Sequence, residues 1–107
     1  MPTPKPQTPL EIIRSVNPRL ADLTDGVLFG DIWENAALSK RDRSLITCAV
    51  LVAMNRGDQL KGHLNRALAN GVTKEEINEM MVHLAFYAGW PAGFGGTFVA
   101  KEVFEAA

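Results

Sequence analysis

The sequence predicts an all-α protein of five or six helices, and three observations support this fold class. After the first nine residues, apolar residues recur at helical spacings of three and four. The alternation of apolar and polar residues that is typical of half-buried strands is nearly absent. Two segments have capping-box spacing just before an apolar run, and glycine or proline follows where runs end.

The N-terminal part is expected to hold a tail and two helices. Residues 1–9 contain four prolines and no apolar segment of the kind that a secretory signal needs, so we expect a flexible, extended tail. A short helix should begin near Pro9. Pro18 suits an early position of a second helix that runs towards Trp33.

Ser39 and Asp42 mark the start of a helix that should continue to about Met54. From Leu45 to Met54 every residue except Thr47 is apolar. A surface helix has a narrower apolar stripe than this, so we expect burial on several sides, part of it between subunits.

Two further helices are indicated by their caps. The first covers about residues 57–70 and is closed by Gly71, which adopts left-handed geometry without a Cβ clash. The second begins at a capping box formed by Thr73 and Glu76. We expect it to end at the Gly-Trp-Pro sequence of residues 89–91, since glycine and proline both stop a helix.

Residues 89–96 are rich in glycine. They lack the lysine and the preceding strand of a phosphate-binding loop, so we interpret them as a tight turn that lets two helices pack closely. A last helix is expected to carry four apolar side chains, those of Phe94, Phe98, Val99 and Phe104.

Length and charge exclude several classes of protein. With 107 residues, the chain is expected to form one domain over residues 10–107. Its net charge of -1 lacks the basic excess of proteins that bind nucleic acid. The longest apolar run is about half of the ~20 residues that cross a bilayer, so no membrane partner is expected. Cys48 is the only cysteine and excludes an intrachain disulfide, which fits a cytoplasmic location.

His63 lies on the same helical face as Leu60, Leu64 and Ala67. Two interpretations stay open for it. It is either a core histidine whose ring is satisfied by one acceptor, or a general acid or base whose reference pKa of about 6.5 suits neutral pH.

His83 forms a polar stripe with Glu79 and Tyr87, which lie one turn away on either side. Glu79 could orient the ring and Tyr87 could donate a hydrogen bond, but the same spacing also suits a contact between subunits. No further ligand set accompanies the two histidines, so we expect no metal site.

Arg41 and Arg43 stand in the first turn of a helix, where the helix dipole disfavours cations. Either Asp42 compensates their charge, or one arginine holds a substrate carboxylate through two parallel hydrogen bonds. Aromatic side chains could form either the wall of a ligand pocket or part of the core, and these are Trp33, Tyr87 and Trp90.

Short motifs follow one another along most of the chain. They are Trp33, Leu38-Ser39, the Arg41 to Leu45 run, His63 with Ala67 and Gly71, Glu75-Glu76-Ile77, and the His83 to Pro91 run. In this order they resemble the carboxymuconolactone decarboxylase family over about residues 20–105. The resemblance implies an alkylhydroperoxidase D-like helical bundle and a ring-shaped homo-oligomer, typically a hexamer built as a trimer of dimers.

The resemblance also separates two chemical branches of the wider family. In the alkylhydroperoxidase branch, a Cys-x-x-Cys pair ends four residues before a histidine. Counting back from His63, those positions hold Arg56 and Gln59, neither of which can form a thiolate. The usual dithiol peroxidase mechanism is therefore excluded.

The remaining branch is that of the cofactor-free decarboxylases, which convert a carboxylated lactone into an enol-lactone. Loss of carbon dioxide leaves electrons that the lactone carbonyl must accept, so the site needs donors to that oxygen, an acid and a carboxylate clamp. We assign proton transfer to His63, and carbonyl polarisation or orientation to His83 with Tyr87. The expected substrate-binding residues are Arg43, Gln59 and Trp33.

Three positions depart from the decarboxylase pattern. Asn35 replaces an arginine, Gln59 replaces a carboxylate, and Gly95 replaces an asparagine. These changes favour a paralogue that acts on a related lactone or keto acid. A redox protein that uses Cys48 alone and a non-catalytic ligand-binding oligomer stay open as alternatives.

Overall fold

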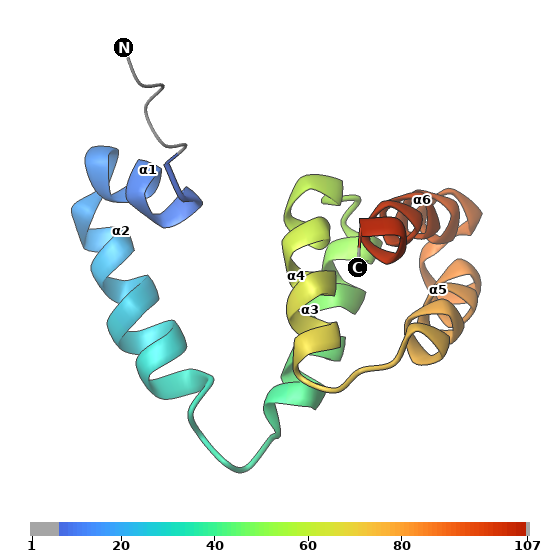
Figure 1. The fold of residues 1–107 in the computed structure, drawn as a ribbon, viewed down its shortest axis with the longest axis horizontal. Coiled ribbons are helices and arrows are strands. Elements are labelled where there is room, and N and C mark those ends of the chain that lie inside the picture. The colour runs from blue at the N-terminus through green and yellow to red at the C-terminus, as the bar shows by residue number, and fades with distance from the viewer. Residues whose placement is uncertain (1–6, 107) are drawn as a thin grey trace. The chain divides into compact units, whose positions relative to one another are not determined.

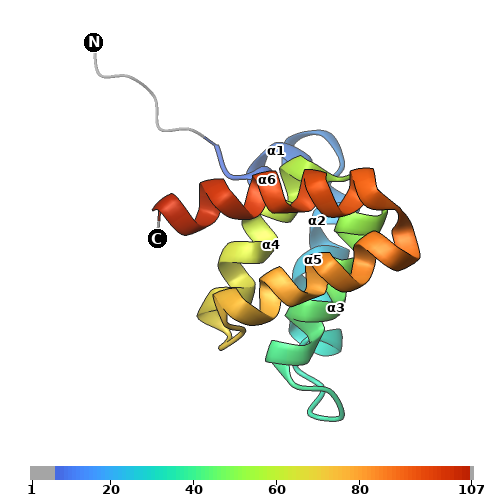
Figure 2. The same ribbon diagram turned by 90° about the vertical axis from the view of Figure 1, so that its right-hand side faces the viewer.

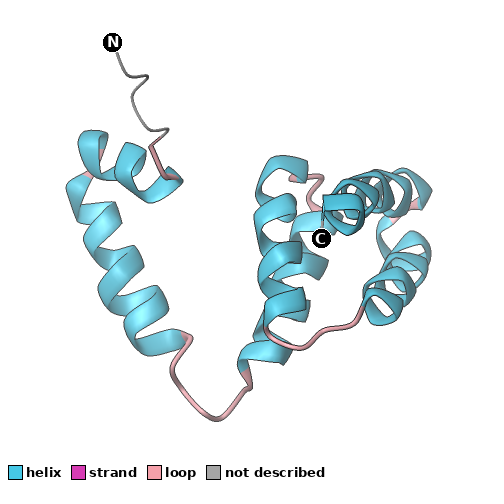
Figure 3. Ribbon diagram, in the orientation of Figure 1, coloured by secondary structure: helices cyan, strands magenta, loops and turns pink. Residues whose placement is uncertain are grey.

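The computed structural model describes residues 7–106, and every regular element in that range is a helix (Figure 3). This confirms the predicted all-α fold class. None of these helices combines the length and the apolar character that a membrane span requires. The elements are α1 Pro9–Val16, α2 Pro18–Leu23, η1 Thr24–Ile32, α3 Lys40–Ala53, α4 Gly57–Ala69, α5 Lys74–Ala88 and α6 Trp90–Ala106 (Figure 1).

The chain divides into two compact units, of which the first ends at Ala37 and the second begins at Leu38. The first unit contains α1, α2 and η1. Ion pairs from Arg14 to Asp22 (2.7 Å) and to Asp25 (2.9 Å) connect these elements. Of the predicted N-terminal tail, residues 1–6 lie outside the described residues, and Pro9 is already the first residue of α1.

The helix predicted from Pro18 towards Trp33 is present, but its second half is a π-helix, η1, instead of an α-helix. The Trp33 amide accordingly donates to the Leu28 carbonyl, five residues earlier, at 2.9 Å. A Cβ at Gly30 would lie only 2.8 Å from the backbone oxygen of Asp25. Glycine therefore permits a backbone approach that periodicity alone does not reveal.

The second unit is a bundle of α3, α4, α5 and α6 (Figure 2). Both predicted helix starts are confirmed, since Ser39 accepts from the Asp42 amide and Thr73 forms a capping box with Glu76. Gly71 has the predicted positive φ, at 99°. The buried core comes from all four helices and the α4–α5 loop, and its largest members are Val52, Leu60, Leu64, Ile77 and Val103.

Within the chain, α3 is fully buried on one side only, and the burial expected between subunits stays a prediction. Its buried residues, Ser44, Cys48 and Val52, form a single stripe. A second stripe of Ile46, Val50 and Met54 is about half exposed. The unit has only three other helices, which is too few to surround α3 completely.

The predicted turn over residues 89–96 is also wrong, because only Gly89 separates α5 from α6. Gly89 has a φ of 105°, and this single left-handed residue reverses the chain. Pro91 then lies in the first turn of α6, where a proline costs no hydrogen bond. The predicted close packing is nevertheless present, with Gly93 and Gly96 buried inside α6.

Gly93→Ala should destabilise the protein by about 1–3 kcal/mol, because its Cβ would lie 2.9 Å from the Cβ of Ala85 and 3.1 Å from the Met81 carbonyl oxygen. Gly62→Ala on α4 is the matched control, since nothing lies within 4 Å of its Cβ. Alanine there should stabilise the helix by up to about 1 kcal/mol. Urea denaturation of both variants checks the prediction, and equal effects would contradict it.

Candidate functional site

The candidate site is built around His83 on α5. His83 lines a cavity of about 460 Å³ between α3 and α5. The other lining residues are mainly apolar, and they are Leu45, Ile46 and Ala49 from α3 with Glu76, Glu79, Met80 and Leu84 from α5. Sequence reasoning did not include Ile46 and Ala49, because only the packing of α3 on α5 reveals which side of α3 faces the imidazole.

A network of hydrogen bonds at the N-terminal ends of α3 and α5 positions the walls of this cavity. Arg41 on α3 donates to Asp42 at 3.1 Å and also to Glu76 on α5. Glu76 accepts from the Thr73 amide in the capping box, and this bond, followed by Arg41, lowers the pKa of its carboxyl group. Of the two interpretations left open for the arginines, the structural one therefore applies to Arg41.

Arg43 stands one turn from the N-terminus of α3 and is half-buried. Its Nε donates to the Leu38 carbonyl oxygen at 3.1 Å. This bond fixes the segment that leads into α3. Arg43 does not line the cavity of His83. No lysine or arginine does, so a carboxylated ligand in this cavity would need a cation from elsewhere in the protein.

The structure brings His83 and Tyr87 together, as the one-turn spacing predicts. Their rings stack, with centroids 4.7 Å apart and planes inclined by 25°. Tyr87 is 80% exposed, so its hydroxyl is accessible to a ligand or a second subunit. Glu79 lies one turn before His83 and lines the same cavity. An imidazole, a phenol ring and a carboxylate thus share one face of α5.

His63 lies on α4, and its Nδ1 is buried without a hydrogen-bond partner in the described part of the chain. Burial lowers the pKa of the imidazole, and the positive charge of Arg66 lowers it further. Burial lowers the pKa of a histidine in either interpretation, so the shift does not decide between them. The unpaired Nδ1 leaves a position at which a ligand, a water or a second subunit can form a hydrogen bond.

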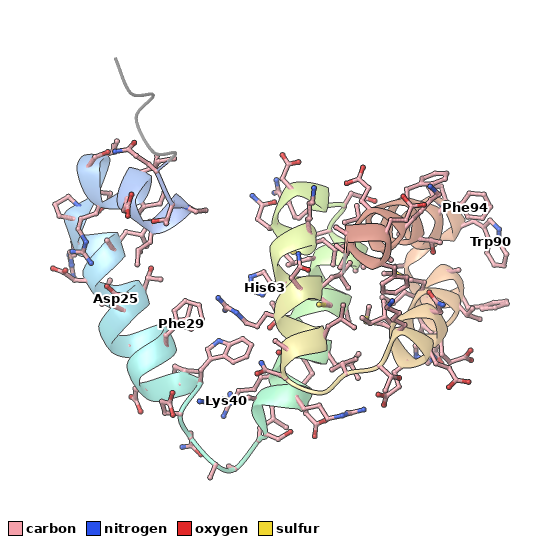
Figure 4. All side chains as sticks on the ribbon, viewed as in Figure 1. Asp25, Phe29, Lys40, His63, Trp90 and Phe94 are labelled. Carbon is pink, nitrogen blue, oxygen red and sulfur yellow. The ribbon has the colours of Figure 1, made fainter. Side chains whose placement is uncertain are left out.

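Among the three main cavities of residues 7–106, His83 lines one and His63 lines none. His63 projects from the side of α4 that faces away from α5 (Figure 4), and none of the main cavities includes it. Gln59 is exposed, one turn before His63 on α4. Trp33 follows η1 in the first unit, where its ring lies 6.0 Å from that of Phe29.

Cys48 is 1% exposed, within the buried stripe of α3. Burial raises the pKa of its thiol to about 11. The thiolate, which is the nucleophilic form, is therefore scarce at neutral pH. This environment is unfavourable for a redox mechanism that uses Cys48 alone.

The pKa of His63 should lie below 6.5, since burial and then Arg66 disfavour the imidazolium ion. The unfolded chain then binds this proton at a higher pH than the folded chain does. The free energy of unfolding should therefore fall as the pH drops from about 6.5 towards the folded pKa. NMR titration of the two imidazoles, with His63→Gln as the assignment control, measures this. A His63 pKa of 6.5 or more would contradict the inferred burial.

Comparison with known proteins identifies the family. The model of the carboxymuconolactone decarboxylase family matches residues 18–102. The chain is 38% identical to 4-carboxymuconolactone decarboxylase of Acinetobacter baylyi over 90% of its own length and 72% of that protein. It is 34% identical to a nitrosuccinic acid decarboxylase of Metarhizium robertsii over 69% of its own length and 52% of that protein. The chain therefore belongs to the carboxymuconolactone decarboxylase family.

Proposed function

We propose that this protein is a cofactor-independent carboxy-lyase. Its substrate is a carboxylated lactone or a related keto acid of aromatic catabolism, and its product from a lactone is the enol-lactone. The observation that carries the proposal is the 38% identity to a 4-carboxymuconolactone decarboxylase over 90% of the chain. The second relative is also a decarboxylase, which supports the reaction type independently of the substrate.

The proposed mechanism follows from what decarboxylation requires. Cleavage of the bond to the carboxylate carbon releases carbon dioxide, and its electron pair moves into the adjacent carbonyl as an enolate. Donors at that oxygen stabilise the enolate, and His83 with Tyr87 supplies them. A proton then returns to carbon from His63. Because the pKa of His63 is lowered, the ring is mainly neutral at pH 7 and must take up a proton before it transfers one.

The substrate carboxylate is assigned to Arg43, with Gln59 and Trp33 as further contacts. His83 lines one of the three main cavities and His63 lines none of them, so we propose that a site using both histidines combines two subunits. This agrees with the proposed ring-shaped homo-oligomer, a hexamer built as a trimer of dimers. We propose that residues 10–107 act as one domain in this assembly, in the cytoplasm.

Asn35 supports a substrate that differs from that of the named relative. Where the decarboxylase pattern has an arginine, the Asn35 Oδ1 accepts from the Ala37 amide at 2.9 Å and stabilises a turn. A side chain with this local role cannot replace the lost cation. Carboxymuconolactone is the reference compound for a first test, and the loss of a cation favours lactones and keto acids with fewer carboxylates as the next candidates.

Turnover is tested by the loss of ultraviolet absorbance of carboxymuconolactone, without added metal. His63→Gln should lower kcat by about 10²–10⁴-fold, the usual contribution of a general acid or base. Asn65→Gln is the control, because Asn65 is exposed on the same helix and donates a hydrogen bond to the Lys61 carbonyl oxygen. Light scattering should show unchanged assembly in both variants.

Two results would contradict the proposal at different points. Unchanged turnover in His63→Gln would remove His63 from the mechanism and leave the activity assignment intact. Failure of the unaltered protein to decarboxylate any carboxylated lactone or keto acid would contradict the enzyme assignment itself. Thermal-shift screening of the same compounds would then identify ligands that bind without turnover.

A further inference from the structure

Four aromatic side chains form an exposed surface on α5 and α6, which we call the aromatic face. Its members are Phe86, Trp90, Phe94 and Phe98, which are 74%, 54%, 58% and 66% exposed. Phe86 contacts Trp90 edge to face with ring centroids 5.3 Å apart, and Phe94 contacts Phe98 in the same way at 6.4 Å. Trp90 and Phe94 project outward from the bundle (Figure 4).

The aromatic face is large for a chain of this size. Buried aromatic side chains cover roughly 150–250 Å² each, so four that are more than half exposed present roughly 350–600 Å². The largest apolar patch on a typical monomer is about 300–600 Å² and is commonly functional. Each partner in a stable complex buries about 800 Å², so this face could supply roughly half to three-quarters of one side of an interface.

The face also contains a hollow beside its projecting rings. A cavity of about 440 Å³ lies between α5 and α6, and its walls include Val82, Ala85, Trp90 and Phe94. Gly93 forms part of its lining, where the two helices approach too closely for a Cβ. A surface with both projections and a hollow can be complementary to a second copy of itself.

The absence of charge determines which partner fits. From Leu84 to Ala100 the sequence contains no aspartate, glutamate, lysine or arginine. A two-fold contact places each surface against itself, so a charged face would repel its copy and a neutral one does not. A charged partner would find no complementary group here. A lipid surface is disfavoured as well, because the adjacent Lys101 is already paired with Glu105 at 2.6 Å.

We propose that the aromatic face binds the aromatic face of a second copy of this chain. Trp90, Phe94 and Phe98 recur every four residues along α6, with Phe94 at their centre. Antiparallel packing of α6 on its copy would place Phe94 near the two-fold axis and Trp90 against the partner's Phe98. The inference rests on the proposed homo-oligomer and assigns one of its contacts.

Light scattering and sedimentation test the contact in the full chain. Phe94→Arg and Phe98→Arg should each weaken association by at least about 30-fold, as expected for central aromatic residues of an interface. Asn65→Arg is the matched control, because it adds the same charge at an exposed position on α4 and should leave association unchanged. Circular dichroism verifies that each variant is folded.

A crosslinking experiment tests the geometry without removing an aromatic ring. In a Cys48→Ala background, Thr97→Cys should give covalent dimers with a short bismaleimide, because Thr97 is exposed and lines the hollow of the aromatic face with Trp90 and Phe94. Gly62→Cys, at an exposed glycine of α4 with open space around its Cβ position, should not.

Each contrary result has a distinct meaning. A monomeric unaltered protein would overturn both this contact and the proposed oligomer. An oligomer that persists in both arginine variants, or that does not crosslink through residue 97, would overturn the contact alone. The decarboxylation assay is separate, so loss of the proposed activity in the unaltered protein leaves the contact to be judged by association.

Discussion

The close approach of α6 to α5 is the constraint on which both functional surfaces depend. At Gly93 the two helices are so near that a Cβ would collide with Ala85. At its other end, α5 is held to α3 by the pairing of Arg41 with Glu76. Because α5 is fixed on both sides, one of its faces completes the cavity of His83 with α3. A different face of α5 carries Phe86, which forms the aromatic face together with side chains of α6.

The chemistry of the cavity is limited by what lines it. His83, Tyr87 and Glu79 share a face of α5, but the lining has no cation to hold a carboxylate. His63 has a buried and unpaired nitrogen on a different helix. The groups to which we assign roles in decarboxylation thus lie in separate places on the chain. The proposed assembly of several chains would bring them to one substrate, and the aromatic face is the contact that we propose for it.

Local signals predicted most of the helix boundaries well. Ser39 and Thr73 begin their helices as expected, because a cap is a contact between residues three apart and is visible in the sequence. The stacking of His83 on Tyr87 is likewise a one-turn relation. By contrast, the π-helical turns around Gly30 and the single-residue turn at Gly89 depend on backbone geometry that apolar periodicity does not report.

The sequence by itself determined the helical class, the caps, the missing thiol pair and the family, since each depends on residue types at fixed spacing. Only the tertiary structure decided which sides of the helices meet. It separated His63 from the cavity of His83 and buried Cys48. It also left the stripe of Ile46, Val50 and Met54 on α3 about half exposed, as well as the aromatic face. The physical reason is that helix packing depends on volumes and close approaches between distant residues, such as Gly93 and Ala85, which no local pattern encodes.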